Sequence, residues 1–224
     1  MLYLLSEFLV AFSVLGLSSR ERADVLLIRR FRVKHFVLAG LLGASVCPLH
    51  LGIYELSKGV MVELFWFLPS NPEIARPVWK WIFLLAIFPP IFEELLFRGY
   101  IMGVMRMFLH SRMVPVIISA FLFGLSHDPK NVFGATIAGL LCGIIATETM
   151  SLFPAMAFHS ALNLSVLLIE IVGDTELGRS TVVSIQDHSY WSLALSFVVS
   201  VACLWRIFAT SCIENKGDNK IRLG

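Results

Sequence analysis

The feature that most constrains this chain is a series of apolar runs long enough to cross a lipid bilayer. A bilayer core about 30 Å thick requires roughly 20 helical residues, because each residue adds about 1.5 Å along a helix. The runs that reach or approach this length are Leu2–Leu17, Phe36–Tyr54, Val78–Met107, Val114–Ser126, Val132–Thr147, Leu152–Val172 and Trp191–Phe208. The sequence therefore predicts an all-α polytopic membrane protein with about seven transmembrane helices.

The composition agrees with a lipid environment. Hydrophobic residues make up 57% of the 224 residues and charged residues 15%, whereas soluble domains average about 45–50% and about 25%. No basic stretch with interleaved aromatic residues indicates nucleic-acid binding. The four cysteines are scattered through mostly apolar sequence without metal-ligand spacing, so we interpret them as small buried hydrophobic residues. No internal repeat divides the chain, and we expect a single membrane domain over residues 1–224.

Lysine and arginine are concentrated after the first, third and last predicted spans. Such clusters favour the cytoplasmic side, and with seven spans all three fall on one side of the membrane. This predicts a multi-pass protein of the inner or plasma membrane, with the N-terminus outside and the C-terminus cytoplasmic. The clusters are Arg20, Arg22, Arg29, Arg30, Arg32 and Lys34; Arg106 and Arg112; and Arg206, Lys216, Lys220 and Arg222.

Three segments carry further structural predictions. Pro89–Pro90 interrupts the long apolar run 78–107, because proline has no N–H to donate, so we expect a new helix to begin near Pro90. Val60–Leu68 is too short to cross the bilayer and is predicted to be a re-entrant or interfacial piece. The acidic segment 173–189 is predicted to be an external loop.

The most unusual polar residues lie in the motif Glu93–Glu94–xxx–Arg98. An ionisable side chain inside a span costs about 2.5–3.5 kcal/mol on insertion scales and usually marks a functional site. Glu94 and Arg98 are four residues apart, so they share a helical face and can form an ion pair. Glu93 lies about 100° around the helix and lacks that cation, which makes it a candidate general base. The alternative is an acidic helix start that interacts with the helix dipole.

Two more helices carry polar pairs with the same spacing of four. Phe123 and His127 form one pair, and His159 and Asn163 form the other. Each alone is equally typical of an interfacial histidine or of a hydrogen bond within a bundle. Together with the glutamates they would be unsatisfied in lipid, so we expect them to converge in a buried polar cavity. Such a cavity holds a base and hydrogen-bond donors for an oxyanion, which are the groups that hydrolysis requires. His50 and His110 are interpreted as ordinary helix-end and interfacial residues. Asp128 directly follows His127 but points about 100° away on a helix, and Pro129 suggests a loop there, so Asp128 is a secondary candidate for the site.

These three motifs, in this order and in an apolar context, resemble the CPBP family of CAAX proteases and bacteriocin-processing proteins, also described as glutamic intramembrane proteases. The resemblance covers roughly residues 80–170. It implies an intramembrane endopeptidase in which Glu93 activates the attacking water and His127 binds that water. It further implies that His159 and Asn163 donate hydrogen bonds to the oxyanion, that Glu94 is a second catalytic carboxylate, and that Arg98 and Phe123 orient the site.

The resemblance also implies a membrane-associated protein or peptide as substrate. One glutamate and two histidines can hold zinc, but no HExxH motif is present, so we expect no metal and no other cofactor. Neither HExxH nor GxGD occurs, which disfavours the zinc and aspartyl classes of intramembrane protease. The remaining alternative is a non-catalytic relative that acts in bacteriocin immunity or as a scaffold.

Overall fold

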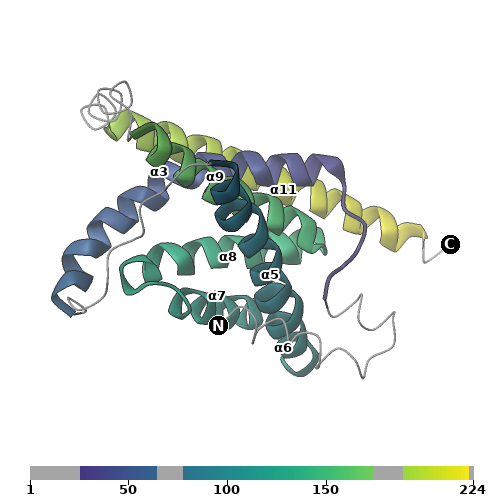
Figure 1. Ribbon diagram of the computed structural model, residues 1–224. Helices are drawn as coiled ribbons and strands as arrows, with labels where there is room; N and C mark the ends of the chain where they lie inside the picture. The colour runs from purple at the N-terminus through teal and green to yellow at the C-terminus, as the bar shows by residue number, and fades with distance from the viewer. Residues whose placement is uncertain (1–25, 65–77, 174–188, 222–224) are drawn as a thin grey trace.

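The computed structural model describes residues 26–64, 78–173 and 189–221. These residues form helices and no strand, which confirms the predicted all-α class. Figure 1 shows the helices in chain order. Their bounds are α3 Val33–Leu64, α4 Val78–Trp81, η1 Ile82–Ile87, α5 Phe88–Glu94, η2 Leu95–Ile101, α6 Met102–Phe108, α7 Val114–Leu125, η3 Pro129–Asn131, α8 Val132–Thr149, α9 Leu152–Gly173 and α11 Ser189–Ile221.

Within these residues, three segments are long and apolar enough to cross a membrane: Val33–Ile53, Pro129–Thr149 and Leu152–Ile169. Two shorter apolar helices, Val114–Leu125 and Ala194–Thr210, accompany them. The predicted first span, Leu2–Leu17, and nearly all of the predicted external loop lie outside the described residues. Seven transmembrane helices therefore remain a prediction.

One predicted segment differs from the structure. Of the predicted piece Val60–Leu68, residues 60–64 are not separate, because α3 continues to Leu64, and residues 65–68 lie outside the described residues; the intervening Glu55 and Lys58 are good helix formers and do not end a helix. The helix α7 agrees with the predicted run Val114–Ser126 to within one residue, and its 12 residues give about 18 Å, which falls short of a bilayer core about 30 Å thick. His127, just after α7, therefore lies closer to the level of Glu93 than a full-length span would place it.

The helices are arranged around α8, which lies between α7 on one side and α3 and α9 on the other (Figure 1). At one end of this bundle, hydrogen bonds and an ion pair involve the segments that contain Arg29, Arg112 and Arg206, one from each of the three basic clusters. Ser151 Oγ donates to the Arg29 carbonyl at 3.1 Å, and the Arg112 guanidinium lies 3.0 Å from Glu148. His35 Nε2 is 2.9 Å from Thr210 Oγ1, near Arg206. The basic clusters flanking the described spans are thus brought to the same end.

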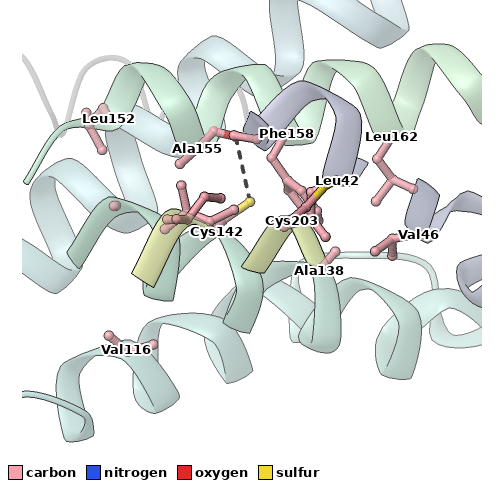
Figure 2. Packing of buried hydrophobic residues seen from close by; sticks show 14 of the residues in the cluster. Leu42, Val46, Val116, Ala138, Cys142, Leu152, Ala155, Phe158, Leu162 and Cys203 are labelled. Atoms are coloured by element: carbon pink, nitrogen blue, oxygen red, sulfur yellow. Dashed lines mark hydrogen bonds between the residues drawn. The ribbon is translucent and has the colours of Figure 1, made fainter. Parts of the chain in front are cut away.

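The core is formed mainly by α3, α8 and α9, and Figure 2 shows the packing around Cys142. The Cys142 thiol donates a weak hydrogen bond to the Ala155 carbonyl at 3.9 Å, so small side chains let α8 and α9 approach. The helices α3 and α9 approach each other closely at Gly43, where an added Cβ would lie 2.1 Å from the Phe158 carbonyl oxygen. Because Phe158 precedes His159, this crossing also fixes the position of a candidate site residue.

We expect Gly43→Ala to destabilise the bundle by about 1–3 kcal/mol, the usual cost of overpacking a core. The obstacle is backbone, which cannot rotate away as a side chain would. Gly40, one turn earlier in α3, has no atom within 4 Å of an added Cβ and supplies the matched control. Thermal unfolding in detergent should show a lower Tm for Gly43→Ala and an unchanged or higher Tm for Gly40→Ala. Equal Tm values for both variants would contradict the close crossing.

Candidate active site

The two glutamates are positioned by an irregular helix that runs from α4 to α6. The π-helical segment η1 precedes Pro89 and Pro90, and a second π-helical segment, η2, follows Glu94 directly. Segments of π-helix shift the side chains that follow them around the helix axis, and they are frequent at functional sites. The predicted restart near Pro90 is close to the observed start of α5 at Phe88, although the chain remains helical through the junction.

The predicted pair of Glu94 and Arg98 is present and fully buried. Arg98 Nη1 donates to Glu94 Oε1 at 3.0 Å, and both side chains are 0% exposed. Arg98 Nη2 donates to the Gly139 carbonyl at 2.8 Å, while the Phe123 ring lies 4.4 Å from the guanidinium carbon. An added Cβ at Gly139 would come within 2.8 Å of Arg98 Nη2, so glycine is required for this approach. Arg98 therefore neutralises Glu94 on its own helix and contacts two others, α7 through Phe123 and α8 through Gly139.

His159 lies between the two glutamates. Its Nδ1 is 3.0 Å from Glu94 Oε1, and its Nε2 is 3.6 Å from Glu93 Oε2. Because a carboxylate oxygen accepts, Nδ1–H donates to Glu94. Nε2 is then the nitrogen that can exchange a proton with Glu93 or with a substrate. Glu93 is less buried than its neighbour, with 13% of its side chain exposed against 0% for Glu94.

His127 belongs to the same cluster. Its Nδ1–H donates to the Phe123 carbonyl at 2.8 Å, and its ring centre lies 4.4 Å from that of Phe123. His127 also interacts electrostatically with Glu93 and His159. With Nδ1 used by the carbonyl, a neutral His127 keeps an unprotonated Nε2 that can accept a hydrogen bond from water.

Asn163 makes a hydrogen bond within the helix bundle, which is the interpretation considered above as the alternative to an oxyanion donor. Its Nδ2 donates to the Leu85 carbonyl at 3.0 Å. In a regular α-helix that carbonyl would accept from residue 89, and in a π-helix from residue 90. Both are prolines and have no N–H, while the Phe88 N–H donates to Phe83 instead. Asn163 therefore supplies the hydrogen bond that the two prolines remove, and it joins α9 to the helix that carries the glutamates.

We expect Asn163→Leu to destabilise the protein by about 1–3 kcal/mol, because the Leu85 carbonyl loses its donor. Ser160→Ala, one turn earlier on α9, is the control, since Ser160 makes no hydrogen bond within the described residues. The measurement is Tm in detergent for the two variants. An Asn163→Leu protein with the Tm of the wild type would show that the contact with Leu85 contributes nothing to stability.

The residues that could hold a metal differ from the set considered above. Within the described part of the chain, one group has ligand atoms within 4.8 Å of one another: Glu94, Cys142 and His159. This group does not fit a divalent cation well, because Glu94 Oε1 already accepts from both Arg98 and His159. The buried guanidinium, 3.0 Å from the same oxygen, would repel a second cation at close range. We derive no chemistry through a metal at this position.

The structure thus brings Glu93, Glu94, Arg98, Phe123, His127 and His159 into one cluster, with Asn163 bonded to the helix that carries the glutamates. Two further residues join them. Cys142 lies beside Glu94, which nothing in the sequence indicates, because a single cysteine in an apolar run shows no metal-ligand spacing. His50 interacts electrostatically with His127 and His159; the signal in the sequence is a lone ionisable residue inside a predicted span.

Residues 75–165 match the family model described as Type II CAAX prenyl endopeptidase Rce1-like. The resemblance to the CAAX protease family is thereby confirmed. The matched segment includes every residue of the three motifs and runs from just before α4 into α9. No curated protein and no solved structure gives a significant match to the chain.

Proposed function

We propose that this protein is an intramembrane endopeptidase that hydrolyses a peptide bond of a membrane-associated substrate with a water activated by Glu93. The observation that carries this proposal is the continuous chain of contacts from Glu93 through His159 to Glu94 and Arg98. In this chain of contacts the partly exposed Glu93 carboxylate lies next to His159, which can exchange a proton with it. The buried Glu94 carboxylate is paired with Arg98, which is always charged. Two carboxylates in unlike environments are typical of sites that divide acid and base roles.

In the proposed reaction Glu93 removes a proton from water while the water oxygen attacks the carbonyl carbon of the scissile peptide. His127 Nε2 accepts the second hydrogen of that water and orients it. In this step His159 carries a proton on both ring nitrogens, so that Nδ1–H stays bonded to Glu94 while Nε2–H is free to donate. This Nε2–H and the second Nδ2 hydrogen of Asn163 donate to the oxyanion that develops on the carbonyl oxygen. The proton on Glu93 then passes to the leaving nitrogen, the C–N bond breaks, and a carboxylate and an amine are released.

An apolar groove formed by the helices that carry the cluster supports a substrate with an apolar tail. It has a volume of about 830 Å³ and lies between α3, α9 and the helix that carries the glutamates. Ile91 and Leu95, on the helix of the glutamates, and Ala157 and Ser160, on the helix of His159, line the groove, whereas the catalytic residues themselves do not. A prenyl group on a cysteine near the end of a peptide has the size and apolar character to occupy such a groove.

The test is proteolysis by the purified full-length protein in lipid vesicles. The probe is a peptide with a prenylated cysteine near its C-terminus, and the control is the same peptide without the prenyl group. We expect cleavage on the C-terminal side of the prenylated cysteine, and much slower cleavage of the control, with both products identified by mass spectrometry. Absence of cleavage of either peptide, and of any protein in the membranes that carry it, would contradict the enzymatic assignment and favour a scaffold.

A further inference from the structure

We infer that His50 on α3, together with Asn131, forms a polar port through which water reaches Glu93 and His127. The inference rests on the proposed function, because a hydrolase whose site lies among apolar helices must obtain one water for each peptide bond cleaved. His50 and Asn131 lie outside the three motifs, and the port adds a fourth helix to the site.

The geometry of Gly134 shows that the two side chains adjoin. An added Cβ on Gly134 would lie 2.9 Å from Asn131 Oδ1, 2.9 Å from His50 Cε1 and 3.1 Å from His50 Nδ1. Both side chains therefore converge over the start of α8, on the side that faces α3. A larger residue at 134 would push them apart, so glycine keeps the polar pair together.

The hydrogen-bonding state of this pair favours bound water. Asn131 Oδ1 is buried and has no hydrogen-bond partner within the described residues, and His50 makes no hydrogen bond to a described residue either. Buried polar atoms in proteins are nearly always hydrogen-bonded, often to an ordered water. A water on Asn131 Oδ1 can also bond the imidazole of His50, and His127 lies four residues before Asn131 in the same turn.

The turn beside the pair indicates how water arrives. Residues 126–131 join the short helix α7 to α8 and carry Ser126, Asp128 and Lys130. Asp128 is exposed, and its carboxylate accepts from the Lys130 backbone N–H at 2.9 Å. A charged turn that breaks the run of α-helix, as here between α7 and α8, is tolerated near the hydrocarbon region only where it meets water or is buried in protein. The port therefore begins at this turn, at the opposite end of α8 from the basic clusters.

Water access is tested without catalysis by hydrogen–deuterium exchange at the imidazole Cε1 position, followed by mass spectrometry of the full-length protein in lipid vesicles in D2O. Two histidines of the same chain are internal references: His110 is exposed, and His35 is 4% exposed and bonded to Thr210. We expect His50 to exchange much faster than His35. Exchange as slow as that of His35 would overturn the port, whether or not the protein cleaves a peptide.

The catalytic consequence is tested with His50→Leu, His50→Gln and His110→Leu. We expect His50→Leu to lower kcat by about tenfold or more with KM for the prenylated peptide unchanged, because water delivery and not substrate binding is impaired. His50→Gln, which still bonds water, should recover part of that loss, and His110→Leu should behave as wild type. A His50→Leu enzyme with wild-type kcat would overturn the inference, as would equal losses in both His50 variants accompanied by a lower Tm. Failure of every variant and of the wild type to cleave would instead refute the proposed function, and the exchange rate would then decide the port alone.

Discussion

Glu93→Gln should reduce the rate of peptide hydrolysis by about 10²- to 10⁴-fold, the contribution typical of a positioned general base. Glutamine keeps the size of the side chain and can still contact His159 Nε2, now 3.6 Å from the Glu93 carboxylate. It cannot accept a proton from water. Because 13% of the Glu93 side chain is exposed and Arg98 pairs with the other glutamate, the Tm should change little.

The measurement is kcat and Tm of Glu93→Gln and of the wild type, at equal protein and lipid content. A loss of kcat with unchanged Tm assigns Glu93 to the chemistry. A variant that retains full activity, or that loses activity only because it unfolds, would exclude Glu93 as the base.

Arg98→Met should destabilise the protein by about 3–5 kcal/mol, the usual cost of breaking a buried ion pair from one side. Arg98 is 0% exposed and lies 3.0 Å from Glu94, so its removal leaves a carboxylate buried without a cation. Adding Glu94→Gln to this variant should restore most of the stability, because both charges are then gone.

The matched control for this experiment is Arg112→Met. The Arg112–Glu148 distance is also 3.0 Å, but the Arg112 side chain is 59% exposed, and exposed pairs contribute only about 0–1 kcal/mol. Tm values of the three variants in detergent check the prediction. If Arg98→Met is no less stable than Arg112→Met, or if the double variant is less stable than Arg98→Met, the buried pair does not hold the site together.

Much of the fold follows from patterns that are local in the sequence. The apolar runs 132–147 and 152–172 became α8 and α9 with ends displaced by no more than two residues. The pairing of Glu94 with Arg98 follows from helical spacing alone. These features depend on neighbours along one helix, which a sequence displays directly.

The features that were missed depend on contacts between helices. His50 follows Pro48 in an apolar run and has no partner four residues away, so nothing in α3 indicates that it meets the turn before α8. A hydrogen bond within the bundle was one interpretation of Asn163, but its acceptor was not identified, although two consecutive prolines leave the Leu85 carbonyl without a backbone donor. The length of α7 follows from the sequence to within one residue. The interaction of His127, just after α7, with Glu93 does not, because it joins different helices.

The central claim is that the water activated by Glu93 attacks the peptide directly. Hydrolysis of one equivalent of prenylated peptide by excess enzyme in ¹⁸O-water, followed by mass spectrometry of the products and of the protein, tests it most directly. The account predicts one ¹⁸O atom in the new carboxylate of the product and none in residue 93. An unlabelled product together with ¹⁸O in the side chain of Glu93 would show that the glutamate attacks the substrate itself, and would contradict the account.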